Sequence, residues 1–132
     1  MANIRIGLRA ELEITVTEEK TAAAIGSGLV PAFATPVMVE LFETAAVQAL
    51  SGHLDPDDTT VGTWIEVSHL AATPVGERVR LEAELVGIDG RKLTFDLHAY
   101  DEHEPIGQGR HHRMIVSSER FGAKLRAKLR EE

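Results

Sequence analysis

The feature that most restricts the fold of this chain is one long apolar helix followed directly by a series of strand-like runs. Thr35 suits an N-cap and Pro36 suits the first helical position, and the apolar residues that follow recur at spacings of three and four. This pattern predicts a helix over 35–50 that ends near Gly52. Its apolar side carries small residues that let a sheet pack closely against it: Ala45, Ala46 and Ala49.

Strand-like alternation of apolar and polar residues precedes the helix once and then follows it repeatedly. Before the helix, 10–17 alternates in this way, and a short helix is expected over 18–25. Asp89-Gly90 is typical of a hairpin whose type I′ turn has positive φ at both central residues. From Ser118 onward, apolar residues at spacing four predict a terminal amphipathic helix. The strands expected after the first helix cover roughly 61–71, 77–88, 92–101 and 105–116.

Consecutive strands, rather than strands alternating with helices, indicate an α+β protein with an antiparallel sheet. We expect a sheet of about five strands wrapped around the helix over 35–50, with a C-terminal helix, which is the hotdog fold. No repeat or linker divides the 132 residues, so 1–132 is expected to form a single domain.

Composition excludes several functions. A net charge of -7 argues against a nucleic-acid surface, and the lack of cysteine rules out disulfides and thiolate chemistry. No apolar run approaches the roughly 20 residues of a membrane span, and charged residues interrupt the first 20 residues where a signal peptide would be apolar. We therefore expect a cytoplasmic protein with no membrane or nucleic-acid partner. No metal-ligand spacing or phosphate-binding loop is present, so neither a metal nor another cofactor is expected.

Several short strings, in their order and spacing, carry a resemblance to a known family. The chain resembles the fluoroacetyl-CoA thioesterase type of hotdog protein, over about residues 5–128. The resemblance implies hydrolysis of an acyl-CoA thioester, in a homodimer with its sites at the subunit interface. The strings are FATPVMV (33–39), VSHLAATPVG (67–76) and GQGRHHR (107–113), together with the helix that carries Glu43.

The resemblance also implies site residues, position by position. The catalytic group is Thr35, Glu43 and His69, and the substrate-binding residues are Gly62 and Arg113. One departure concerns 25–30, which would lie near the acyl pocket and contains no aromatic residue. Selectivity for a fluorinated acyl group is therefore not carried over, and the expected substrate is a short-chain or unidentified acyl-CoA.

The residues themselves are compatible with this chemistry, although each also has a simpler interpretation. Thioester hydrolysis needs a nucleophile or positioned water, a base and donors to the oxyanion. Thr35 is either the hydroxyl for this step or only a helix cap, and Glu43 is either a partly desolvated base or an exposed helix glutamate. His69 shares the inward face of its strand and is either a base or a core histidine. Glu43 opposite His69 would repeat the logic of a catalytic triad.

The last strand and the C-terminal segment leave further alternatives open. Gly107 and Gly109 leave room for a ligand or another backbone, or else mark a bulge. Residues 106–132 hold seven of the 14 Lys and Arg but only three of the 21 Asp and Glu, which suits either coenzyme A phosphates or a solvated helix. Two other functions stay possible on this fold: a non-catalytic acyl-CoA binding module, and an enoyl-CoA hydratase or dehydratase.

Overall fold

The computed structural model describes residues 3–129, in which five antiparallel strands and two substantial helices follow one another in the predicted order. Every predicted strand and helix is present, with ends displaced by no more than a few residues. The elements are β1 (Arg9–Thr15), η1 (Glu18–Lys20), α1 (Ala22–Ile25), α2 (Thr35–Ala49), β2 (Asp58–His69), β3 (Arg78–Asp89), β4 (Lys92–Tyr100), β5 (Pro105–Ser117) and α3 (Ser118–Leu129).

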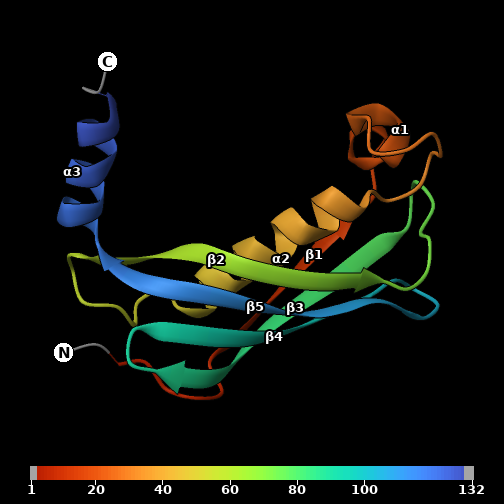
Figure 1. The fold of residues 1–132 in the computed structure, drawn as a ribbon. Helices are drawn as coiled ribbons and strands as arrows, with labels where there is room; N and C mark the ends of the chain where they lie inside the picture. Colours follow the sequence, from red (N-terminus) through yellow and green to blue (C-terminus); the bar gives the residue numbers. More distant parts are fainter. Residues whose placement is uncertain (1–2, 130–132) are drawn as a thin grey trace.

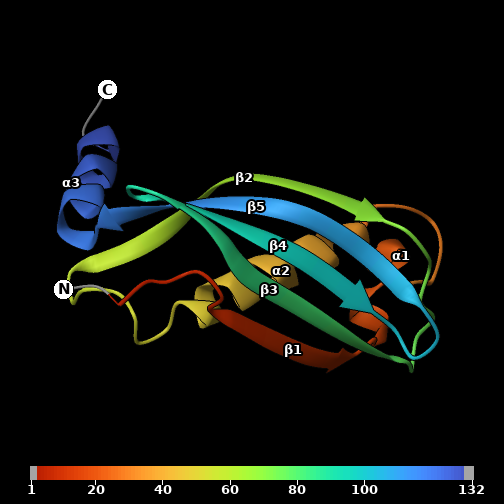
Figure 2. The same ribbon diagram turned by 90° about the horizontal axis from the view of Figure 1, so that it is seen from below.

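The strands form one sheet in the order β1-β3-β4-β5-β2, so β1 and β2 are its edges. Hairpins join β3 to β4 and β4 to β5, whereas β2 crosses over to pair with β5, as in the register Gly62↔Arg113 and His69↔Gly107. Figures 1 and 2 show the sheet curved around α2, which lies along its concave face. The fold is therefore the predicted α+β arrangement of one sheet around one long helix.

The core lies between α2 and the concave face of the sheet. Met38, Phe42, Ala45 and Ala46 on α2 are fully buried. The small alanine side chains let the helix pack directly against β1 and β3. Burying a side chain of the size of Met38 or Phe42 stabilises the fold by about 1.5–3 kcal/mol each. The strand residues that meet them alternate along β3 and β4: Val79, Leu81, Ala83, Leu85, Leu93, Phe95, Leu97 and Ala99.

Two local predictions are wrong. The N-cap of α2 is Ala34, with extended backbone, while Thr35 is the first helical residue and makes no capping hydrogen bond. In the β3–β4 hairpin, Asp89 pairs with Lys92 and only Gly90 has positive φ, at +61°. This is the requirement of a type II′ turn, not of the type I′ turn predicted from Asp89-Gly90. The first correction matters for function, because it frees the Thr35 hydroxyl from a capping role.

The two glycines of β5 serve close packing within the protein. A Cβ on Gly107 would lie 2.6 Å from Met38 Sδ, and one on Gly109 would overlap the Glu66 carbonyl oxygen. These positions are therefore already occupied by α2 and by the backbone of β2. The ladder irregularity between β2 and β5 falls instead between Gly62 and Trp64.

Helix α3 stands at the end of the sheet opposite α1 (Figure 1). None of its described side chains is buried, and Leu125 and Leu129 are 54% and 81% exposed. No helix within residues 3–129 is long and apolar enough to cross a membrane.

Candidate active site

The first residue of α2 and the last residue of β2 meet in a direct side-chain contact. Thr35 Oγ1 and His69 Nδ1 are 2.7 Å apart, the distance of a strong hydrogen bond. The hydroxyl that does not cap the helix is therefore paired with an imidazole from the strand. A hydroxyl beside a histidine nitrogen is the arrangement that activates an oxygen nucleophile or a bound water.

Backbone hydrogen bonds on both sides hold this pair in place. The Phe33 N–H donates to the Thr73 carbonyl at 2.9 Å, and the Ala34 N–H donates to the Lys20 carbonyl at 3.0 Å. On the strand, the Leu70 N–H donates to the Ile106 carbonyl at 2.7 Å directly after His69. The backbone positions of both residues are thus fixed by the chain around them.

The surroundings of His69 favour its neutral form. The edge of its ring contacts Phe33, with centroids 6.3 Å apart, and Phe33 is itself 2% exposed. Burial lowers the pKa of His69 below its ordinary value of 6.5, and the nearby Ala71 backbone offsets part of this shift. His69 Nε2 is buried and makes no hydrogen bond of ordinary geometry within the described residues. A neutral imidazole with Nδ1 facing a hydroxyl is competent as a base.

An open, largely apolar groove of about 860 Å³ contains the pair. Its walls come from the segment after α1, the start of α2 and the chain that follows β2. Leu70, which lines this groove, is 52% exposed, and Leu29, which lies between the lining residues Gly28 and Val30, is 96% exposed. The lining residues are Ala22, Ser27, Gly28, Val30, Ala32, Phe33, Thr35, Pro36, Val39, His69, Leu70, Ala71 and Ala72.

Glu43, Gly62 and Arg113, which the sequence also nominated, form a separate cluster near the middle of α2. A Cβ built on Gly62 would lie 3.2 Å from His111 Cε1, 3.3 Å from Arg113 Nη1 and 3.4 Å from Glu43 Oε2. Three polar side chains therefore converge on a strand position that has no side chain of its own. Burial lowers the pKa of Arg113, and the Glu43 carboxylate opposes this shift.

Two members of this cluster, Thr60 and His111, were not nominated from the sequence. Arg113 Nε donates to Thr60 Oγ1 at 2.9 Å, Nη2 donates to the Thr60 carbonyl at 3.2 Å, and Nη1 lies 3.0 Å from His111 Nε2. Thr60 was missed because the strand was expected to start at 61. Extending the alternation of β2 back to Asp58 places Thr60 beside Arg113.

Within one protomer the two clusters do not meet. Thr35 and Glu43 are eight residues apart on α2, which separates their backbones by about 12 Å along the helix axis. The expected approach of Glu43 to His69 is therefore not made inside a single chain. Thr35 and His69 are brought together, and Glu43, Gly62 and Arg113 are brought together.

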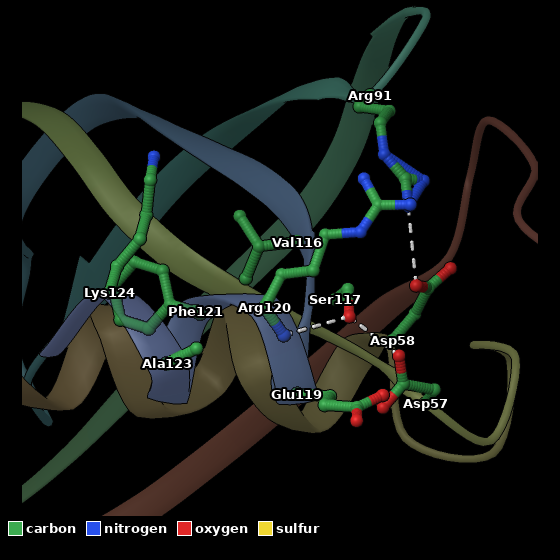
Figure 3. Close-up of a pocket in the computed structure, with 10 residues that line it drawn as sticks. All are labelled: Asp57, Asp58, Arg91, Val116, Ser117, Glu119, Arg120, Phe121, Ala123 and Lys124. Carbon is green, nitrogen blue, oxygen red and sulfur yellow. Dashed lines mark hydrogen bonds and ion pairs between the residues drawn. The ribbon is translucent and has the colours of Figure 1, made fainter. Parts of the chain in front are cut away.

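A second hollow of about 1060 Å³ lies at the other end of the molecule, where α3 begins (Figure 3). Its charges are in part satisfied locally. Arg91 Nη2 lies 3.2 Å from Asp58 Oδ1, and Ser117 Oγ donates to Asp57 Oδ2 at 2.6 Å. The described lining residues hold no hydroxyl and imidazole in contact, so the smaller groove at Thr35 is the better candidate site.

Comparison with known proteins supports this choice. A family model described as fluoroacetyl-CoA-specific thioesterase matches residues 16–119, a range that includes both clusters. A relative from Streptantibioticus cattleyicolor, named fluoroacetyl-CoA thioesterase, is 44% identical over 96 residues, which are 73% of this chain and 69% of that protein.

Solved structures agree over nearly the whole chain. A structure of the fluoroacetyl-CoA thioesterase has a TM-score of 0.87 at 37% identity, covering 95% of this chain and 97% of that one. A Thermus thermophilus protein described as a thioesterase superfamily member has a TM-score of 0.89 at 31% identity, covering 96% and 94%. A hot-dog-like protein from Thermanaerovibrio acidaminovorans, at 21% identity and a TM-score of 0.90 over 98% and 96%, supports the fold alone.

These matches confirm the hotdog fold and the family resemblance. Of the activities that the sequence left open, they favour thioester hydrolysis over hydration or binding alone. The chain belongs to the fluoroacetyl-CoA-specific thioesterase family.

Proposed function

We propose that this protein hydrolyses short-chain acyl-CoA thioesters to the free acid and coenzyme A, with Thr35, His69 and Glu43 as its catalytic group. The observation that carries the proposal is the 2.7 Å contact between Thr35 Oγ1 and His69 Nδ1 at an open apolar groove. A structure of a variant of the related fluoroacetyl-CoA enzyme holds acetyl-CoA, which is a short acyl thioester.

The reaction follows from these positions. The Thr35 oxygen, or a water that it holds, attacks the thioester carbonyl carbon while His69 Nδ1 takes the proton. The carbon–sulfur bond then breaks, and the proton passes to the coenzyme A thiolate. If Thr35 itself attacks, water hydrolyses the acyl ester in a second step of the same kind. Free N–H groups at the start of α2 favour the oxyanion that develops between attack and cleavage.

The acyl group is assigned only as a short chain. Ser27, Gly28 and Val30 line the groove beside the pair, and residues 25–30 place no aromatic ring there. The proposal therefore includes no selectivity for a fluorinated acyl group.

The proposed active form is a homodimer in the cytoplasm, in which two copies complete each other's sites. Edge strand β2 leaves one side of its backbone without a strand partner among the described residues, which favours pairing with a second copy. His69 Nε2 makes no hydrogen bond of ordinary geometry among the described residues, and Glu43 lies about 12 Å along α2 from Thr35. In the proposed dimer, Glu43 of the partner subunit faces His69 and orients its ring as the third group of a triad.

Antiparallel pairing of two β2 strands would also explain the basic C-terminal segment. In one protomer, β2 spans about 36 Å between the end near α3 and the end at His69. Pairing of β2 with an antiparallel copy brings the partner's α3 to the His69 end. There Lys124, Arg126 and Lys128 would contact the phosphates of coenzyme A.

Subunit complementation tests the function and the composite site together. Thr35→Ala and Glu43→Gln chains are co-expressed with two different affinity tags, and the mixed dimer is purified through both. Each parent protein is expected to be inactive in a thiol-release assay across a panel of acyl-CoA esters. A mixed dimer keeps one intact composite site and is expected to recover about half of the wild-type rate.

Each other outcome removes one part of the proposal. A mixed dimer as inactive as its parents would place the whole site within one chain. Failure to purify any chain through both tags would exclude the dimer. A wild-type protein that releases no thiol from any ester of the panel would overturn the function itself.

A further inference from the structure

His111 is a fully buried histidine that the proposed hydrolysis does not use. It lies in the middle of β5, with 0% of its surface exposed, and its ring is 6.2 Å from that of Phe95. Its neighbour His112 points to the opposite face, where it stacks on Trp64 with ring centroids 4.5 Å apart. A buried polar ring in an otherwise apolar core needs a reason, because leaving it unpaired is costly.

Hydrogen-bond chemistry determines which nitrogen of His111 carries the proton. Nδ1 lies 2.9 Å from the Trp64 carbonyl oxygen, which can only accept, so Nδ1 must donate. Nε2 lies 3.0 Å from Arg113 Nη1, and a guanidinium can only donate, so Nε2 must accept. Both contacts are satisfied together only by the neutral ring with its proton on Nδ1.

Arg113 depends on this acceptor for its orientation. It is 6% exposed, and Thr60 holds its Nε and Nη2 through the two hydrogen bonds described above. The contact to His111 Nε2 adds a third fixed point, on Nη1, the Arg113 atom that faces Gly62. Five N–H bonds in a rigid plane leave little freedom once three nitrogens are held. The guanidinium is thereby directed at the place where Glu43 Oε2 also lies.

We propose that His111 is a positioning residue, which as the neutral Nδ1–H tautomer orients Arg113 and so fixes its positive charge near the Glu43 carboxylate, beside Gly62. The inference rests on the proposed role of Glu43 in thioester hydrolysis. A proton on Nε2 would replace the acceptor by a donor, push Nη1 away and release Arg113 from one of its three contacts. The positive charge near Glu43 would then no longer be held in place.

The electrostatics of the cluster support a neutral ring. Burial lowers the pKa of His111, and the charges of Arg113 and His112 lower it further. The Trp64 carbonyl and the Glu43 carboxylate act in the opposite direction without reversing the shift.

Two substitutions of His111 separate orientation from packing. In His111→Gln the side-chain oxygen reaches the position of Nε2 and keeps an acceptor for Arg113. In His111→Asn the shorter amide reaches only the position of Nδ1, so it keeps the donor to Trp64 and loses the acceptor. His112→Gln and His112→Asn are the matched controls, because that ring lies on the other face of β5.

The expected kinetic result is a loss of kcat that the conservative variant rescues. His111→Asn should lower kcat for the best acyl-CoA about tenfold with little change in KM, because the charge near Glu43 moves and no hydrogen bond to the substrate is removed. His111→Gln should keep kcat within about threefold of the wild-type value, and His112→Gln and His112→Asn should do the same. Equal losses in the Gln and Asn variants would show a packing role only and overturn the inference, as would an unaffected His111→Asn protein.

Nitrogen NMR of the wild-type protein labelled at histidine and arginine provides a test that needs neither activity nor a stable variant. The spectrum should show the His111 proton on Nδ1 and a separate, slowly exchanging set of Arg113 guanidinium signals. A proton on Nε2, or a charged ring at neutral pH, would overturn the inference. If the wild-type protein released no thiol, that result would count against the proposed function, whereas the spectrum would still decide the role of His111.

Discussion

Gly62→Ala is the substitution that best tests whether Glu43, His111 and Arg113 act together. Gly62 does not have positive φ, so its backbone conformation accepts an alanine. The added methyl group would contact all three side chains at 3.2–3.4 Å. These contacts are tight, and the neighbours must move by a few tenths of an ångström.

Stability should change little. Replacing glycine at a compatible position stabilises a protein by about 0.4–1 kcal/mol, because the unfolded chain loses freedom. The tight contacts oppose this gain, and the one to Glu43 Oε2 involves the end of a flexible side chain that can shift. The net change is expected to lie within about 1 kcal/mol, which corresponds to about 3–6 °C in Tm for a chain of this size.

Activity should change more than stability. A misplacement of about 1 Å at a catalytic group can cost about a hundredfold in rate, so a few tenths of an ångström at Glu43 predicts a fall of about three- to tenfold in kcat. The assay is thiol release from the best acyl-CoA of the panel, measured beside the thermal melting curve of the same preparation.

Gly87→Ala is the matched control. Its Cβ would lie 3.3 Å from Thr94 Cβ, a contact as tight as those at Gly62, but on β3 and away from both clusters. It should share the small change in Tm and keep wild-type kcat. An unchanged kcat in Gly62→Ala, or an equal loss in Gly87→Ala, would refute the functional interpretation of the Gly62 cluster.

Three further predictions concern the groove and the C-terminal helix. Thr35→Ala should lower kcat about a hundredfold or more, and Thr35→Ser should recover most of it; equal rates in both variants would exclude the hydroxyl from the reaction. Because burial lowers the pKa of His69, the base form of this residue persists as the pH falls below 6.5. The acid limb of the pH profile of kcat/KM should therefore lie below pH 6.5, and an acid limb above pH 6.5 would contradict the role of His69. Neutralising Lys124, Arg126 and Lys128 together should raise KM for acyl-CoA and weaken the dependence of KM on ionic strength, with kcat retained. If the wild-type protein had equal KM values for acyl-CoA and for a thioester without the nucleotide, a phosphate contact would be excluded.

The fold was predictable because the hydrophobic pattern and the topology agree. The alternating residues of β3 and β4 predict one apolar face on the sheet, and the spacing of three and four in α2 predicts one apolar face on the helix. Each of these two faces is buried by packing against the other. The type of the β3–β4 turn was not predictable to the same degree. Asp89-Gly90 fits two turn types, and the registry of Asp89 with Lys92 selects the one that requires positive φ at Gly90 alone.

The candidate site was predictable as a set of residue types but not as a geometry. A threonine before a proline suits a helix cap, and sequence alone does not tell whether its hydroxyl will turn to the helix or to another element. The choice depends on where β2 ends, because His69 reaches Thr35 only in the register that pairs His69 with Gly107. Thr60 and His111 depend on the same long-range register, which places both beside Arg113.

The separation of the two clusters is the physical reason for proposing a composite site. α2 is rigid, so Thr35 at its start and Glu43 in its middle stay about 12 Å apart in every state of a folded protomer. A carboxylate that must approach His69 therefore cannot come from the same helix by local motion. In the proposed dimer, a second copy related by a two-fold axis would supply that carboxylate and receive the same contribution in return. Hydrolysis should therefore depend on dimerisation. Conditions that separate the proposed subunits should abolish turnover, while the Thr35–His69 hydrogen bond within each protomer remains.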